Sequence, residues 1–207
     1  MSASNNIYAE AKTAVFWDIE DCKIPNGLDA IDVSHNIRRA LANVGYHGTV
    51  SIKAYGDGTK AGSFSAEIEL VHFPAEHKRE KLKEILADFF VWAMDHREPS
   101  NLMLLVGDIS EDTALLDAIQ FLRSQNYNIL LAQPQVATGV LLTIPSSAWL
   151  WESLSAGGKP IDQTTSSQSV DNTTSACSGS SQGVMPSPPT SERSGRARRK
   201  RQSKVRH

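Results

Sequence analysis

The sequence predicts a doubly wound α/β fold, in which helices cover both faces of a mostly parallel sheet. Apolar runs of strand length alternate with helical periodicities from about residue 13 to about residue 152, a pattern typical of parallel sheets. Two of these runs, residues 13–18 and 101–106, end next to acidic residues, as strands do at the ligand-binding edge of such folds. Right-handed crossovers restrict the topology, and we expect the strand order 3-2-1-4-5.

The first half of the expected domain can be assigned in chain order. Residues 14–19 form a buried strand, and apolar residues spaced three and four apart over residues 30–44 form one face of a helix. Residues 49–55 alternate between apolar and polar side chains, which predicts a second strand. Residues 59–66 have weak patterning and are expected to be a loop, and residues 68–73 alternate again as a short third strand.

The second half continues the alternation. Apolar spacing predicts a helix over about residues 76–95, a strand over 102–106 and a third helix around residues 115–122. Residues 128–132 suit a fifth strand that Pro134 stops. Residues 148–151 suit a sixth strand or an edge element, and the two tryptophans there favour packing over stacking on bases.

Composition divides the chain into a domain and a tail. We assign residues 10–157 of the 207 to the domain and residues 158–207 to a disordered tail, because Ser, Thr, Gln, Gly and Pro dominate the latter. No apolar stretch approaches the ~18 residues that a membrane span needs. The polar N-terminus lacks a signal-peptide pattern, and two distant cysteines suit a reducing compartment. A cytoplasmic or nuclear location is expected.

The net charge of −2 averages two opposite regions. Residues 193–207 carry eight Lys and Arg and no acid, which leaves 13 cations against 23 acids, or −10, for residues 1–192. Such a basic segment could contact RNA, act as a nuclear import signal or simply aid solubility. The residues expected to contact nucleic acid are Arg196, Arg198, Arg199, Lys200 and Arg201.

Acidic residues at two strand ends are the candidate metal ligands. Asp18 ends the first strand, with Glu20 and Asp21 close behind, and Asp108 follows the fourth strand. Strands 1 and 4 are neighbours in the expected order, so Asp18 and Asp108 would face each other and suit a hard cation such as Mg²⁺. Three acids within four residues would repel one another without a cation. The alternatives are a turn-forming or capping role for Asp18, and a helix N-cap at Asp108 or Ser110.

A third acid is expected near the start of the helix over residues 76–95. Four acids lie four residues apart there, and Glu80 is the best placed of them for a role in the site. The alternative is a solvated charged surface, which the interspersed basic residues favour. The acids are Glu76, Glu80, Glu84 and Asp88, and the basic residues are Lys78, Arg79, Lys81 and Lys83.

The segment Val15–Pro25, VFWDIEDCKIP, resembles the opening motif of NYN domains, which are PIN-like relatives of nucleases. The closer likeness is to the limkain type, as in meiosis regulator and mRNA stability factor proteins, and to its plant members. Further segments resemble the plant pattern in the same order, over about residues 10–157 in all. They are residues 54–57, 92–95, 105–108, 127–134 and 149–151.

This resemblance implies a PIN-like fold and a metal-dependent endoribonuclease that cleaves single-stranded RNA with Mg²⁺ or Mn²⁺. Asp18 and Asp108 would be ligands, with Asp21 a further ligand and with Asp112 or Glu80 completing the catalytic acids. It also implies regulation of gene expression through mRNA stability, protein partners in that regulation, and an association with peroxisomes.

The chain also departs from the family pattern at the candidate site. Asp21 stands where the family usually has Asn, and Ser110 and Glu111 stand where a second acid is common, with Asp112 displaced. Leu82 aligns with the family's acid in the helix. Two interpretations therefore stay open. The chain is an endoribonuclease with a partly degenerate acidic site, or it is an RNA-binding or adaptor module without catalysis.

Overall fold

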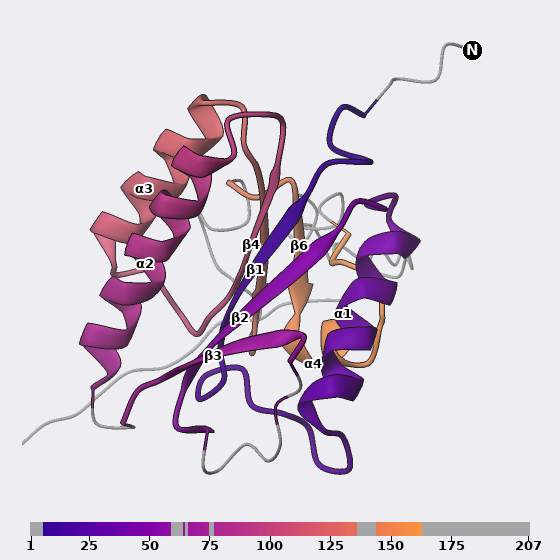
Figure 1. The fold of residues 1–207 in the computed structure, drawn as a ribbon, viewed down its shortest axis with the longest axis vertical. Coiled ribbons are helices and arrows are strands. Elements are labelled where there is room, and N and C mark those ends of the chain that lie inside the picture. The colour runs from indigo at the N-terminus through magenta and orange to yellow at the C-terminus, as the bar shows by residue number, and fades with distance from the viewer. Residues whose placement is uncertain (1–5, 59–63, 65, 75–76, 136–143, 163–207) are drawn as a thin grey trace, which may run out of the picture. The chain divides into compact units, whose positions relative to one another are not determined.

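A six-stranded parallel sheet lies at the centre of the domain (Figure 1). The computed structural model describes residues 6–58, 64, 66–74, 77–135 and 144–162. The strand order is β3-β2-β1-β4-β5-β6, and every neighbouring pair is parallel, which confirms the predicted PIN-like α/β topology. The segment predicted as a sixth strand or an edge element is the edge strand β6 beside β5. The strands are β1 Thr13–Asp18, β2 Val50–Gly56, β3 Ile68–His72, β4 Asn101–Leu105, β5 Asn128–Gln133 and β6 Ser147–Leu150.

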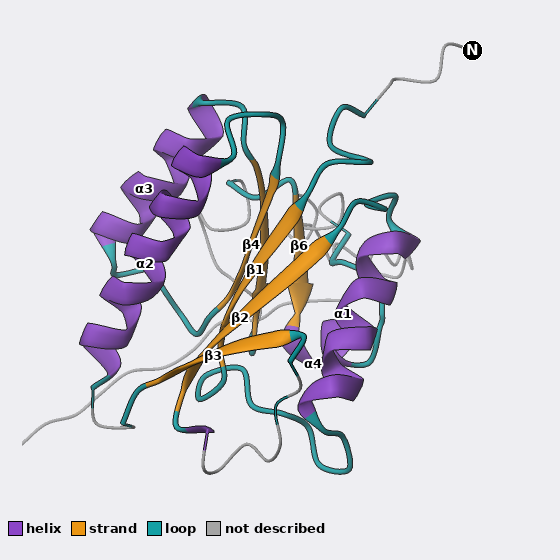
Figure 2. Ribbon diagram, viewed as in Figure 1, coloured by secondary structure: helices purple, strands orange, loops and turns teal. Residues whose placement is uncertain are grey.

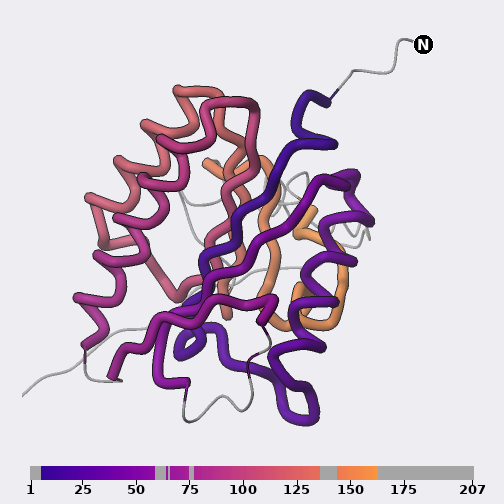
Figure 3. Tube along the Cα trace, in the orientation of Figure 1, coloured from indigo at the N-terminus to yellow at the C-terminus, as the bar shows by residue number. Residues whose placement is uncertain are grey.

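Helices cover both faces of the sheet (Figure 2). The helices α1, Ala30–Asn43, and α4, Trp151–Ser155, lie on one face. The helices α2, Lys78–Asp95, and α3, Thr113–Ser124, run side by side on the other (Figure 3). None of the helices in the described part of the chain is long and apolar enough to cross a membrane.

The short helix α4 differs from the prediction, which continued an extended segment through Trp151. The last residue of β6, Leu150, pairs with Gln133, the last residue of β5. The chain beyond Leu150 therefore has no neighbouring strand to pair with, and it turns into α4. Of the loop predicted over residues 59–66, the structure describes residues 64 and 66. The tail from residue 163, with its basic cluster, lies outside the described residues.

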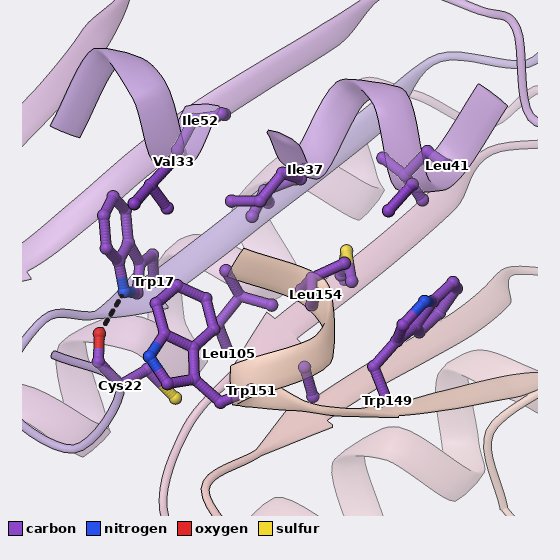
Figure 4. Close-up of a cluster of buried hydrophobic side chains, with 14 of the residues drawn as sticks. Trp17, Cys22, Val33, Ile37, Leu41, Ile52, Leu105, Trp149, Trp151 and Leu154 are labelled. Carbon is purple, nitrogen blue, oxygen red and sulfur yellow. Dashed lines mark hydrogen bonds between the residues drawn. The ribbon is translucent and has the colours of Figure 1, made fainter. Parts of the chain in front are cut away.

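Alternation along β1 divides the core between the two faces of the sheet. Val15 and Trp17 pack on the side of α1, whereas Ala14 and Phe16 pack on the side of α2 and α3. Figure 4 shows the α1 side, where the ring centroids of Trp17 and Trp151 lie 5.5 Å apart. Trp149 is also buried there, so the two tryptophans near the end of the domain are packing residues, as predicted.

Because all strands are parallel, their carboxyl ends share one edge of the sheet. In the ladder between β1 and β4, Trp17 pairs with Leu105, so Asp18 follows directly at this edge. Asp18 pairs with Tyr55 on the other side. The residues after β1 and β4 and the first turn of α2 therefore carry the candidate site.

Candidate functional site at the carboxyl edge of the sheet

A tight turn after β1 holds the first acids together. One carboxylate oxygen of Asp18, Oδ1, accepts hydrogen bonds from the backbone N–H groups of Glu20 and Asp21, at 3.0 and 3.2 Å. The Cys22 N–H donates to the Asp18 carbonyl oxygen, and the Trp17 indole donates to the Cys22 carbonyl oxygen at 2.7 Å (Figure 4). An acidic residue that bonds to the backbone two or three positions on is a common turn former. The turn thus keeps Asp18, Glu20 and Asp21 at the end of β1.

The ammonium group of Lys81 lies within this acidic turn. Its Nζ is 2.6 Å from Oδ1 of Asp18 and 2.8 Å from Oε2 of Glu20. The side chains of Lys81 and Asp18 are only 1% and 3% exposed. Bonds between oppositely charged groups at such distances are among the strong hydrogen bonds of proteins. The prediction of a solvated charged surface at the start of α2 is therefore wrong for Lys81.

Helical spacing explains why Lys81 is buried. The buried face of α2 consists of Lys81, Ile85, Phe89 and Ala93, each four residues from the next. Lys81 extends the same apolar face by one turn toward the carboxyl edge of the sheet. The lysine was missed because its charge suggested exposure, although its spacing from Ile85 and Phe89 placed it toward the core.

A second lysine contacts the remaining acid of the turn. Nζ of Lys78 is 3.0 Å from both carboxylate oxygens of Asp21. Their side chains are 64% and 23% exposed, so this pair faces solvent and contributes little to stability. The other oxygen of Glu20, Oε1, is buried and has no hydrogen-bond partner among the described residues.

The pKa values of the buried pair reflect two opposing influences. Burial raises the pKa of Asp18 and is the largest influence on it, while the hydrogen bond and charge of Lys81 act against it. Burial lowers the pKa of Lys81, but the hydrogen bonds and charges of Asp18 and Glu20 outweigh it, so this pKa is raised. Lys81 is therefore an ammonium ion at neutral pH. We assign Asp18 as its carboxylate partner, because a 2.6 Å contact with a buried cation favours the ionised acid.

Asp108 and Asp112 bond within their own loop. Asp108 is exposed and its Oδ1 accepts from the Ser110 N–H at 2.9 Å, which lowers its pKa. Asp112 is the N-cap of α3 and accepts from the Leu115 N–H at 2.9 Å. The alternative of an N-cap at Asp108 or Ser110 is wrong, because the helix begins later, at Thr113. Glu80 and Glu84 are exposed on α2.

The end of β4 reaches the acidic turn through Gly107. A Cβ atom at this position would lie 2.5 Å from Oδ2 of Asp21, so no larger residue fits without a shift. The close approach places the loop that bears Asp108 beside Asp21. Of the predicted metal ligands, the structure brings Asp18 and Asp21 into one cluster and leaves the Asp108 carboxylate bonded to Ser110.

The carboxylate oxygens of Asp18, Glu20 and Asp21 are not arranged to coordinate a divalent ion in this structure. Mg²⁺ requires oxygen ligands in near-octahedral geometry at about 2.0–2.1 Å. The facing oxygens of Asp18 and Glu20 bind an ammonium group instead, and Asp21 binds Lys78. In the described part of the chain, no group of three or more His, Cys, Asp or Glu side chains is arranged to hold a metal ion.

A second polar network fixes the middle of α2 over the sheet. Oδ2 of Asp88 accepts from the hydroxyl of Tyr55 at 2.7 Å and lies 2.8 Å from Nζ of Lys53. Burial, followed by the hydrogen bond to Asp88, raises the pKa of Tyr55, which therefore stays a donor. Tyr55 also pairs with Asp18 across the β1–β2 ladder. The network thus holds α2 next to the strand end that carries Asp18, and with it the Lys81 side chain.

One comparison with known proteins identifies the domain. A family model described as the NYN domain matches residues 12–143 of the chain. The matched range includes the acidic turn, Lys81 and the loop after β4. A search of the curated proteins found no match.

Proposed function

Because the chain belongs to the NYN domain family, we propose that it acts in RNA metabolism as an RNA-binding module that does not cleave RNA through a metal ion. The family is PIN-like and its members are generally nucleases that depend on divalent metals. One observation carries the proposal, namely the position of the Lys81 ammonium between Asp18 and Glu20, at 2.6 and 2.8 Å.

The chemistry of an ammonium group explains why Lys81 cannot take the place of a catalytic metal ion. A bound divalent ion assists phosphoryl chemistry because it polarises the phosphate and lowers the pKa of a coordinated water. An ammonium group donates hydrogen bonds but has no coordination position for a water molecule. While Lys81 holds Asp18 and Glu20, these carboxylates serve as partners of a fixed cation and not as ligands for a catalytic one.

The basic tail supplies the affinity for RNA in this proposal. The region up to residue 192 has a net charge of −10, whereas residues 193–207 carry eight cations. Arginine side chains bind phosphate groups in a bidentate manner, and binding of this kind depends on salt but little on sequence. The proposed partner is single-stranded RNA, and the proposed contacts are Arg196, Arg198, Arg199, Lys200 and Arg201.

Finer points of the assignment belong to the same proposal. The Val15–Pro25 motif supports a limkain-type, plant-like member, and thus a role in mRNA stability and the regulation of gene expression with protein partners. We propose a cytoplasmic or nuclear location, with peroxisome association as the family alternative.

An endoribonuclease with a partly degenerate site is the second candidate. It is favoured by the retention of Asp18 at the end of β1 and of Asp108 just beyond β4. In this case Mg²⁺ or Mn²⁺ would have to displace Lys81, and Asp108, Asp112 or Glu80 would have to turn toward the cluster. The two candidates make opposite predictions for cleavage.

The test is incubation of labelled single-stranded RNA with the full-length protein in Mn²⁺, in Mg²⁺ and in chelator. We expect RNA that is bound but uncut in all three conditions. Asp108→Asn is the informative variant because Asp108 is exposed and its loss should leave the fold intact. Metal-dependent cleavage that disappears in Asp108→Asn and in Asp18→Asn would contradict the proposal and establish the endoribonuclease.

A further inference from the structure

We propose that Lys81 is the resident cation of the acidic cluster formed by Asp18, Glu20 and Asp21, and that its ammonium group excludes a divalent ion from this position. Replacing Lys81 with an apolar residue would then turn the cluster into a binding site for a hard divalent cation. The inference deepens the proposed function and rests on it, since it names the residue that keeps a metal out.

Burial and contact distances set Lys81 apart from the other basic residues of α2. Its side chain is 1% exposed, whereas that of Lys78 is 64% exposed. Lys81 contacts two carboxylates of the same turn, and one of them, Asp18, is itself almost completely buried. A buried charge is costly unless it is paired. The acid and the lysine therefore depend on each other to remain inside the protein.

The packing of α2 keeps the ammonium group in place. Ile85 and Phe89, one and two turns further along the same helix face, are fully buried in the core. Asp88 joins the helix to β2 through Tyr55 and Lys53. The helix therefore cannot move away from the sheet without loss of these contacts, so a divalent ion competes with a cation that is tethered at the site.

Removal of Lys81 would leave the carboxylates of Asp18, Glu20 and Asp21 with partly uncompensated negative charge and with free oxygen atoms. Among the described residues, the three carboxylates would then retain one cationic partner, Lys78, which is exposed and bonds to Asp21. Oε1 of Glu20 is buried and has no hydrogen-bond partner among the described residues, so it offers a further oxygen ligand. Hard divalent ions bind clusters of carboxylate oxygens. A cation of this kind would restore the lost charge.

The experiment measures binding of Mn²⁺ to the full-length protein by electron paramagnetic resonance, with thermal unfolding in parallel. The variants are Lys81→Met, the double variant Lys81→Met with Asp18→Asn, and Lys83→Met, which makes the same change at an exposed position of the same helix. We expect Lys81→Met to bind Mn²⁺ about tenfold or more tightly than the wild type. Mn²⁺ should raise the melting temperature of Lys81→Met alone, because only its folded state binds the ion.

The outcomes separate this inference from the proposed function. Equal Mn²⁺ affinity in the wild type and in Lys81→Met would overturn the inference, and so would an undiminished effect of Mn²⁺ in the double variant. If Lys81→Met does not fold alone, recovery of the folded state on addition of Mn²⁺ supports the inference, and failure to recover overturns it. Metal-dependent cleavage of RNA by the wild type would overturn the proposed function instead.

Discussion

The proton on Lys81 couples the acidic turn to the stability of the domain. The hydrogen bonds from Lys81 to Asp18 and Glu20 outweigh burial and raise its pKa above the ordinary value of 10.5. A raised pKa in the folded state means that the stabilisation is fully present below pH 10.5 and is lost as the pH rises through the folded value. The domain should therefore lose stability at alkaline pH, through this residue in particular.

We expect the free energy of unfolding to fall more steeply with pH above 10.5 in the wild type than in the double variant Lys81→Met with Asp18→Asn. The double variant removes both charges of the buried Lys81–Asp18 pair, and the Glu20 carboxylate that loses its partner is 25% exposed. Urea unfolding at several pH values measures the slopes, with Lys83→Met as the control for other alkaline titrations. Parallel slopes in all three proteins would show that Lys81 does not titrate with folding.

Cys22 is a second residue whose chemistry follows from the turn. Its side chain is fully buried, and burial raises the pKa of the thiol, with the charges of Asp18 and Asp21 acting in the same direction. Only the thiolate reacts readily with disulfide reagents. The Cys22 thiol should therefore be inert in the folded protein at pH 8, since it is both inaccessible and protonated.

The variant Cys177→Ser leaves Cys22 as the single thiol. We expect no reaction of this variant with a disulfide reagent in native buffer, and complete reaction in urea above the unfolding midpoint. The variant Cys22→Ser, which retains Cys177, monitors the reagent. Rapid modification of native Cys177→Ser would mean that the turn after β1 opens frequently, contrary to the packing around Trp17.

At the scale of elements, the start of α3 gives Asp112 a structural role. Asp112 accepts from the Leu115 N–H at 2.9 Å and caps the helix. Loss of an N-cap side chain costs about 1 kcal/mol of stability. We therefore expect Asp112→Ala to lower the free energy of unfolding by about that amount, as measured by urea unfolding.

The neighbouring exposed acid provides the matched control for this change. Glu111→Ala removes a carboxylate from the same loop and should alter stability by less than about 0.5 kcal/mol. Unchanged RNA binding in both variants is expected, because the proposed contacts with RNA lie in residues 193–207 and include neither residue. A large loss of binding in Asp112→Ala without loss of stability would assign Asp112 to the RNA site instead.

The strands and their order were predictable because parallel strands buried on both faces give nearly continuous apolar runs. β4 and β5 are buried along their whole length, and both were located from sequence. The short helix α4 was not, because its start depends on where β5 ends. The sequence around residue 150 does not show where its partner strand β5 ends, so it did not predict the start of α4.

The candidate site was predictable in position but not in its contacts. Asp18 lies at the end of β1 as expected, yet the sequence did not indicate a lysine partner 63 residues away. The spacing of Lys81 from Ile85 and Phe89 indicated that this lysine lies on the buried face of α2, but its charge suggested an exposed position. The contact of Asp108 with Ser110 is local, but an acid at a strand end can bond to its loop or to a ligand with equal ease.

At the scale of the whole molecule, an acidic region of 192 residues precedes a short basic segment at the C-terminus. Residues 1–192 have a net charge of −10, and residues 193–207 carry eight cations. Inside the domain, Lys81 and Lys78 pair with the acids at the candidate site. These two lysines are therefore engaged with protein carboxylates, and the proposed function assigns the contacts with RNA phosphates to the basic tail.

Deletion of residues 193–207 should therefore weaken the binding of single-stranded RNA and flatten its dependence on salt. The logarithm of the binding constant falls with the logarithm of the salt concentration by about 0.7 for each phosphate neutralised on a single strand. Fluorescence anisotropy with a labelled RNA over a range of KCl concentrations measures this slope. Deletion of residues 173–187 is the matched control, since it removes a segment of the same length without charged residues. An unchanged slope after removal of the basic segment would mean that RNA contacts the domain itself, whereas loss of slope in the control as well would mean that length and not charge is required.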